Sequence, residues 1–271
     1  MTVLDPPVPL DADRLLARID TLAASRPVAA QLVAMTSAED AGARDLARVL
    51  AADVALAGRV MKLANSAYFG MCGRVTSLQF AVTVVGLMTV RTMATVALTD
   101  LGDESALPED FWLTGTHVAQ AAAALAPRFG ERPPDALCLG MLSQIGAALL
   151  HHEDPEGRPA LVAGAEDAPA RRLAETRRYG MHAERLSAVA LRHWGFPPRM
   201  VTALESADDL TAPEGALLRV AAEVAARLSG RPHRPVPVGR LCGGLLEEEP
   251  LTLVVDRVRA EAEELRLALL G

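Results

Sequence analysis

Aromatic residues and cysteines are scarce in this sequence. Aromatic side chains make up 3% of the 271 residues, whereas hydrophobic residues make up 51% and are mostly alanine, leucine and valine. Small and long-chain apolar residues favour close-packed helices over strands. Cys72, Cys138 and Cys242 have no CxxC or zinc-ligand spacing, which argues against a disulfide framework or a structural metal and for a reducing compartment. The composition predicts an all-α globular protein.

The sequence also lacks an excess of positive charge. Its formal net charge is −7, so we expect no nucleic acid partner, because a surface that binds phosphates needs clustered cations. Arg171, Arg172, Arg177 and Arg178 lie close together, but acidic residues interrupt them. Such a charge run is typical of a solvated helix face.

No uninterrupted apolar run is long enough to span a membrane. The longest apolar stretch, residues 78–98, contains Gly86 and Arg91. A central arginine costs roughly 2.5–3.5 kcal/mol in a bilayer-spanning helix, so we expect two buried helices here and no membrane contact. Residues 1–16 have neither the basic nor the apolar region of a signal peptide, which predicts no export and a cytoplasmic location.

Residues that start helices recur along the chain. Pro27 suits the first turn of a helix, and Asp53 can cap a helix that carries Leu56 and Val60. Pro133 is expected to open a helix that continues to Leu149. Two capping boxes are predicted, Ser37 with Asp40 and Thr76 with Gln79. Further helices are expected near residues 108–130, 168–179, 183–194, 197–206, 213–229 and 250–270, with a loop at 230–239.

An Asn-Ser pair stands where the helix after Asp53 should end, in 63-LANSAYFG-70. Asn65 is expected to adopt the left-handed conformation at the helix end and to tie the following loop to backbone groups, while Ser66 caps the next turn. The alternative is that both side chains line a ligand or partner site.

Four stretches of the sequence resemble the HDOD domain family. They are 53-DVALAGRVMKLANSAYFG-70 with 74-RVTSLQFAVTVVGLMTVRTMA-94, then 111-FWLTGTHVAQAAAALAPRFG-130, 137-LCLGMLSQIGAALL-150 and 175-ETRRYGMHAERLSAVALRHWGFP-197. The resemblance extends over residues 15–270. It implies a multi-helix bundle of the HD-domain (phosphodiesterase-like) type without a substantial sheet, and a role in bacterial signal transduction.

The resemblance does not extend to the catalytic pattern of HD phosphohydrolases. Such enzymes hold metal ions with a His-Asp pair in a segment like LLHDIG, where this chain reads 141-MLSQIG-146 and has Ser143 and Gln144. Thr114 stands where an earlier histidine is expected, and His117 lies one helical turn beyond it. No nucleophile elbow, P-loop or dinucleotide fingerprint is present either. We therefore predict no catalytic residue, no metal and no cofactor.

Two arginines offer an alternative to a pure scaffold. We expect Arg74 and Arg91 to lie in apolar helical surroundings, where a guanidinium is costly unless it finds an acceptor. The acceptors can be helix C-terminal carbonyls or a carboxylate, or the arginines can bind a nucleotide in the vestigial cleft without hydrolysing it. The candidate binding residues are Asn65, Ser66, Arg74, Arg91, His117, Ser143 and Gln144.

The sequence predicts a non-enzymatic signalling module that acts as a scaffold for unidentified signalling proteins, as a monomer or homodimer. A divergent metal-dependent phosphohydrolase and a receptor for a nucleotide or cyclic dinucleotide are the alternatives. We expect a flexible N-terminal tail at residues 1–10, an N-terminal helical subdomain at 11–106, an HD-like helical core at 107–230, and a loop with C-terminal helices packing on the module at 231–271.

Overall fold

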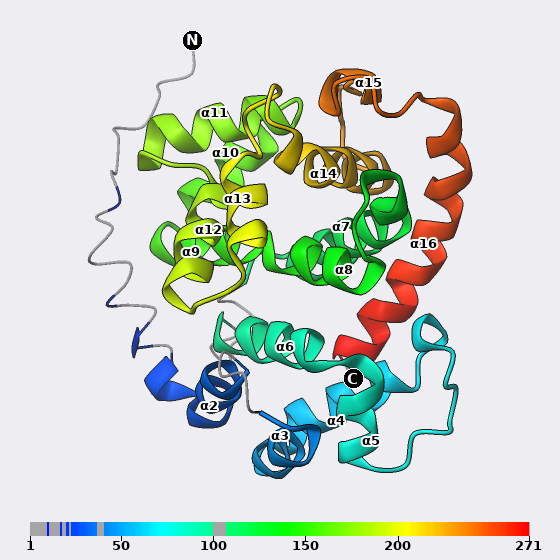
Figure 1. The fold of residues 1–271 in the computed structure, drawn as a ribbon. Helices are drawn as coiled ribbons and strands as arrows, with labels where there is room; N and C mark the ends of the chain where they lie inside the picture. Colours follow the sequence, from blue (N-terminus) through cyan, green and yellow to red (C-terminus); the bar gives the residue numbers. More distant parts are fainter. Residues whose placement is uncertain are drawn as a thin grey trace.

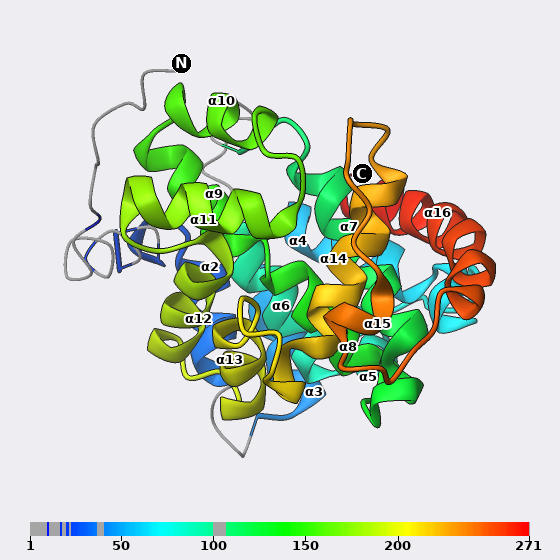
Figure 2. The same cartoon turned by 90° about the horizontal axis from the view of Figure 1, so that it is seen from above.

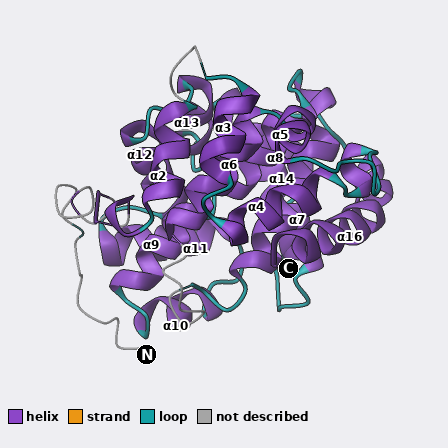
Figure 3. Cartoon of the chain, turned by 90° about the horizontal axis from the view of Figure 1, so that it is seen from below, coloured by secondary structure: helices purple, strands orange, loops and turns teal. Residues whose placement is uncertain are grey.

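A computed structural model describes residues 10, 17, 20, 21, 23–36, 41–99 and 107–270, without the side chains of residues 249, 250, 252 and 253. Within these ranges the regular elements are all helices, and no strand occurs (Figure 3). The prediction of an all-α fold is therefore confirmed.

The first six elements form the lower part of the molecule in Figure 1. They are α2 (Pro27–Met35), α3 (Ala43–Leu50), α4 (Val54–Ala64), the short 3-10 helix η1 (Ala67–Phe69), α5 (Leu78–Val85) and α6 (Leu87–Thr99). Pro27 begins α2 as predicted, and the Asp53 carboxylate caps α4 by accepting from the Leu56 N–H at 2.9 Å.

The two predicted capping boxes precede α3 and α5. Ser77, not Thr76, caps α5, and its hydroxyl accepts from the Phe80 N–H at 3.2 Å. The predicted box is therefore one residue out of register. The box of Ser37 and Asp40 lies outside the described residues, and α3 begins at Ala43.

The apolar stretch at residues 78–98 folds as two helices, as predicted. Gly86, with φ +82°, separates α5 from α6, and the two helices are bent by 102°. In the described part of the chain no single helix is long and apolar enough to cross a membrane. The bent pair of α5 and α6 reaches that length and apolar composition only when the two helices are counted together.

The upper part of the molecule is built around α7 (Phe111–Leu125), which packs against α8 (Pro133–Leu142), α14 (Ala216–Leu228) and α16 (Glu249–Leu270) (Figure 1). A Cβ at Gly140 would lie 2.5 Å from the Ala119 Cα, so only glycine permits the close approach of α8 to α7. The 3-10 helix η3 (Ala126–Phe129) follows α7 directly.

The remaining helices are α9 (Ile145–Glu153), α10 (Gly157–Ala163), α11 (Ala168–Tyr179), α12 (Ala183–His193), α13 (Pro198–Glu205), η4 (Pro213–Gly215) and α15 (Val238–Leu241). In Figure 2, α9 to α13 lie together on one side of α7 and α8, whereas α15 lies against α14. The helix predicted from Pro133 to Leu149 is therefore two helices, and α10 and α15 were not predicted.

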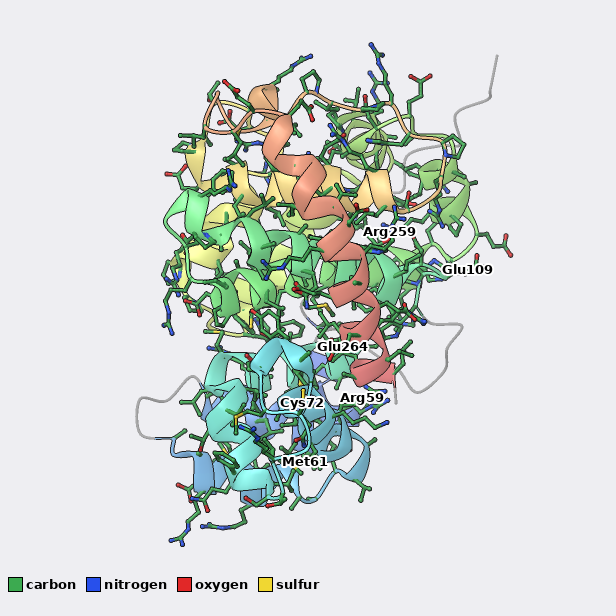
Figure 4. The ribbon with its side chains drawn as sticks, turned by 90° about the vertical axis from the view of Figure 1, so that its right-hand side faces the viewer. Arg59, Met61, Cys72, Glu109, Arg259 and Glu264 are labelled. Carbon is green, nitrogen blue, oxygen red and sulfur yellow. The ribbon has the colours of Figure 1, made fainter. Side chains whose placement is uncertain are left out.

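The last helix, α16, connects the upper and lower parts. It runs along α7 and ends against α4 and η1, and Figure 4 shows Glu264 at this end. There the Glu264 carboxylate accepts from the Ala67 N–H at 2.6 Å. Buried side chains from Ala29 to Leu269 form one continuous hydrophobic cluster, so the two parts share a core.

Candidate functional site

The two residues at the predicted HD-dyad position form the joint between α8 and α9. Ser143 is the C-cap of α8 and is 3% exposed. Its hydroxyl donates to the Gly140 carbonyl at 2.6 Å and accepts from the Gln144 side-chain amide at 2.9 Å. The Ser143 hydroxyl is therefore engaged inside the chain.

Ser187 of α12 holds this joint from the other side. Its hydroxyl donates to the Ser143 carbonyl at 3.0 Å and accepts from the Gly146 N–H at 2.7 Å. A Cβ at Gly146 would lie 1.9 Å from the Ala183 carbonyl oxygen, so α12 approaches α9 at a distance that only glycine allows. The joint is fixed by a tertiary contact.

Thr114 lies on α7 beside the same joint. A Cβ on its neighbour Gly115 would lie 3.5 Å from the Gln144 Cγ, which places the start of α7 against the α8–α9 joint. The Thr114 hydroxyl donates to Asp110 Oδ2 at 3.1 Å, and Arg231 pairs with the same oxygen at 3.1 Å. The fold therefore brings the backbone at the start of α7 beside Gln144, while the Thr114 side chain contacts Asp110.

The side chains at these positions do not fit a catalytic divalent metal. They offer two hydroxyls and one amide, whereas metals that activate water are held by converging imidazole and carboxylate groups. Across the described ranges, no group of three or more His, Cys, Asp or Glu side chains is placed to hold a metal ion.

His117 is one turn beyond Thr114 but belongs to another interface. It is 6% exposed, and Arg259 and Glu263 of α16 are the charged groups that act on it. Burial lowers the pKa of His117, and Arg259 acts in the same direction, which favours the neutral imidazole. The structure does not bring His117 into one site with Ser143 and Gln144.

Arg91 is buried in α6 and finds its acceptor at the end of a helix. Its guanidinium donates to the Trp194 carbonyl at 2.5 Å and lies 4.0 Å from the centre of the Phe196 ring. Trp194 is the C-cap of α12, so the contact matches the predicted alternative of a helix C-terminal carbonyl. Burial lowers the pKa of Arg91 to about 10, which leaves it charged at pH 7.

Arg74 is not in a helix. It lies exposed in the loop between η1 and α5, where its backbone N–H donates to the Met71 carbonyl at 2.7 Å. The assignment of Arg74 to apolar helical surroundings is therefore wrong. Arg91 contacts the end of α12 instead, so the two arginines sit in different structural settings.

Asn65 and Ser66 form a structural joint at the end of α4. The Asn65 side chain donates to the carbonyls of Met61 (3.1 Å) and Val75 (2.9 Å) and accepts from the Val75 N–H (3.0 Å). This loop tie was predicted, but Asn65 has φ −91° and not the left-handed conformation, which Gly70 adopts instead. The Ser66 hydroxyl donates to the Leu63 carbonyl at 2.7 Å and does not cap η1.

A buried ion-pair network between α10, α11 and α12 was missed by the sequence reasoning. Glu175 is fully buried and accepts from Arg158 at 3.2 Å and from the Ala183 N–H at 2.9 Å. Arg171 lies 3.3 Å from Glu175 and 2.6 Å from Glu184, so it joins the two carboxylates.

Glu184 receives two further contacts, from Arg172 and from the His182 imidazole, both at 3.0 Å. Burial alone would raise the pKa of Glu184, but Arg171 and Arg172 hold it well below its usual range. The predicted solvated face is therefore wrong for Arg171 and Arg172. The sequence signal was the helical spacing that places Arg172 and Glu175 on the same face as the buried Tyr179.

Arg178 also departs from the predicted solvated face. Its side chain is 16% exposed and pairs with Asp154 at 2.7 Å, whereas Arg177 is exposed. The Tyr179 hydroxyl donates to the same carboxylate at 3.0 Å. These contacts attach α11 to the end of α9.

Sequence comparison matches residues 22–210 of the chain to the HDOD domain family. No curated protein matches the chain.

Several solved structures have a similar fold. A "Putative phosphohydrolase" from Shewanella amazonensis SB2B is 24% identical, with a TM-score of 0.68 over 94% of this chain and 97% of that one. A "Putative signal transduction protein" from Marinobacter aquaeolei VT8 is 21% identical, with a TM-score of 0.65 over 90% of this chain but 59% of that one. An HDOD domain protein of unknown function from Geobacter sulfurreducens is 20% identical, with a TM-score of 0.63 over 96% and 98% of the two chains. At these identities the likeness describes the fold alone.

Proposed function

The chain belongs to the HDOD domain family, and from this premise we propose that it is a non-enzymatic, cytoplasmic bacterial signalling module that acts as a protein-interaction scaffold. The observation that carries the proposal is the α8–α9 joint. By the resemblance, Ser143 and Gln144 stand where HD enzymes carry the metal-binding dyad, and the Ser143 hydroxyl is already engaged by the Gly140 carbonyl and the Gln144 side-chain amide. A chain without the metal-binding dyad acts through noncovalent contacts.

A hydrolysis assay tests this proposal. We expect the purified protein, given Mg²⁺, Mn²⁺ or Zn²⁺, to hydrolyse neither bis(p-nitrophenyl) phosphate nor a panel of nucleotides and cyclic dinucleotides. Elemental analysis should find no stoichiometric metal. Metal-dependent turnover that is lost in Ser143→Ala would overturn the proposal and favour a phosphohydrolase, the class named for the Shewanella protein. Turnover that persists in Ser143→Ala and elutes with the chain on size-exclusion chromatography would also overturn the proposal, whereas turnover that elutes apart from the chain comes from a contaminant.

The nucleotide receptor remains the second alternative, and calorimetry tests it. Arg91 would have to give up the Trp194 carbonyl to bind a phosphate. Because that exchange leaves a partly buried carbonyl without its donor, it is unfavourable. We expect no heat of binding with millimolar nucleotides, and saturable binding that is lost in Arg91→Met would support a receptor.

The scaffold itself is tested by co-purification from the native cell. We expect a partner at a fixed stoichiometry that remains bound through size-exclusion chromatography. Light scattering of the purified chain alone then distinguishes a monomer from a homodimer. A chain that runs as a monomer and retains no partner in its native cell would contradict the scaffold proposal.

A further inference from the structure

A surface groove lies between α8, α13 and the start of α14, helices that can be followed in Figure 2. Its volume is about 240 Å³. The floor is apolar and is formed by side chains such as Leu139, Met200 and Leu217, which are 8%, 4% and 4% exposed. We call this feature the acidic groove because of the residues at its rim.

Three carboxylates and one guanidinium stand at the rim of the acidic groove: Glu131, Asp135, Glu214 and Arg199. Arg199 is held by Asp135 at 2.7 Å, and Arg132 lies 3.9 Å from the same carboxylate. Glu131 and Glu214 are exposed, and neither carboxylate makes a hydrogen bond or ion pair with another residue that the structure describes. The groove therefore carries two carboxylates that are available to a ligand.

The walls of the acidic groove are fixed by contacts behind them. Gly140 places α8 directly against α7, as described above. Behind Glu214, the buried Arg219 guanidinium donates to the carbonyls of Ser206 (2.8 Å), Asp209 (2.6 Å) and Ala212 (2.8 Å). A Cβ at Gly215 would lie 2.2 Å from the Ser206 carbonyl oxygen. The groove is therefore preformed and needs little rearrangement to accept a ligand.

We propose that the acidic groove binds an arginine side chain of a partner protein. A guanidinium supplies several N–H donors for Glu131 and Glu214, and its methylene stem can cover the apolar floor. Arginine is also a frequent anchor at the centre of protein interfaces. The proposal rests on the scaffold function and names the partner chemistry.

The volume and charge of the acidic groove disfavour a nucleotide, another small molecule or an apolar side chain as its ligand. A volume of about 240 Å³ is below the roughly 300–1,000 Å³ of small-molecule sites, but it suits a side chain or two. Arg199 and Arg132 both pair with Asp135, so the two unpaired carboxylates of Glu131 and Glu214 set the charge that a nucleotide phosphate would meet and repel it. A neutral apolar side chain would leave Glu131 and Glu214 without a partner.

The test uses the full chain and two matched small probes. Nα-acetyl-L-arginine amide and Nα-acetyl-L-citrulline amide have nearly the same shape, but only the first is charged. NMR titration should show saturable shifts of backbone amides in 131–139, 199–203 and 214–217 with the arginine probe and not with the citrulline probe. In Glu131→Gln/Glu214→Gln we expect affinity to fall about 5-fold, the effect of losing two exposed ion pairs.

The control is Glu109→Gln/Glu247→Gln, which makes the same change in net charge at two exposed residues that do not line the groove. It should bind the arginine probe as the wild type does, and circular dichroism should show that both double variants are folded. Equal shifts with citrulline, or equal affinity in the two double variants, would overturn the proposal.

If the acidic groove binds something other than arginine, these experiments give different results. If inorganic phosphate or AMP shifts the groove amides and the arginine probe does not, the site binds anions and the proposal is wrong. If light scattering finds a dimer that only Glu131→Gln/Glu214→Gln dissociates, the occupant is a second copy of this chain. Loss of arginine binding leaves the scaffold function standing, whereas metal-dependent hydrolysis overturns the scaffold function and not the groove.

Discussion

Gly146 and Gly58 differ in the space around them. A Cβ at Gly146 would meet the Ala183 carbonyl at 1.9 Å, whereas a Cβ at Gly58, inside α4, would meet nothing within 4 Å. We expect Gly146→Ala to lower the free energy of unfolding by about 3 kcal/mol, because α9 and α12 must move apart. Gly58→Ala should raise it by about 0.5–1 kcal/mol through helix propensity. Urea unfolding measures both, and a loss below about 1 kcal/mol in Gly146→Ala would show that the α9–α12 contact can yield.

Glu184 gives the stability of the protein a defined dependence on pH. Although burial opposes it, Arg171 and Arg172 depress the pKa of Glu184 in the folded state. The stability that Glu184 contributes is therefore fully present above its pKa in the unfolded state, about 4.3. It is lost as the pH falls through its lower pKa in the folded state. Wild-type stability should decline as the pH is lowered from about 5, and Glu184→Gln should show a shallower decline.

The same variant should be destabilised at pH 7 by about 3–5 kcal/mol, because it leaves buried guanidinium charges without a carboxylate. Glu263→Gln is the control, since Glu263 is an exposed carboxylate whose pKa is lowered by Arg266. Solvent screens that pair, so its loss should leave the pH profile nearly unchanged. Equal pH slopes for wild type and Glu184→Gln in urea unfolding would contradict this assignment.

At the scale of helices, the start of α5 distinguishes two neighbouring hydroxyls. The Ser77 hydroxyl accepts from the Phe80 N–H, and Thr76 is exposed. We expect Ser77→Ala to cost about 1 kcal/mol and Thr76→Ala to change stability by less than half as much. Thermal unfolding of the two variants measures the difference. A larger loss in Thr76→Ala would favour the register that the sequence motif predicted.

Helix starts marked by proline or aspartate were predictable, but the α8–α9 break was not. Ser143 (φ −61°, ψ −21°) and Gln144 (φ −87°, ψ −10°) have near-helical backbone angles, and the apolar periodicity continues across them. Neither residue is a glycine or proline. The break is stabilised by Ser187, which is distant in sequence. A local pattern cannot report such a tertiary contact.

The same limit applies to the candidate site. The resemblance identified Ser143, Gln144 and Thr114 as positions of one pattern, and the fold places Gly115, the neighbour of Thr114, against Gln144. By contrast, the acidic groove combines Glu131 and Glu214 from segments whose packing the sequence does not specify. Its charge and apolar floor become recognisable only when α8, α13 and α14 are assembled.

At the scale of the whole molecule, several contacts join the described part of residues 11–106 to the rest of the chain, and three of them carry the argument. They are the shared hydrophobic core, the pairing of Glu264 with the Ala67 N–H, and the contact of Arg91 with Trp194. The sequence predicts an N-terminal helical subdomain of the HDOD module at these residues. Because the core is continuous, we predict that both parts unfold in one cooperative transition.

Two probes already in the chain can test this prediction. Cys72 is exposed whereas Cys138 and Cys242 are buried, so a maleimide fluorophore on the native protein reports on the lower part. Trp112 in α7 and Trp194 at the end of α12 report on the upper part where it meets Arg59 and Arg91 of the lower part. The two urea transitions should share one midpoint in the wild type. In Arg91→Ala, both midpoints should fall together, because the loss of a contact inside one cooperative unit destabilises all of it. A label transition at lower urea than the tryptophan transition would contradict the prediction and would establish the subdomain boundary near residue 106.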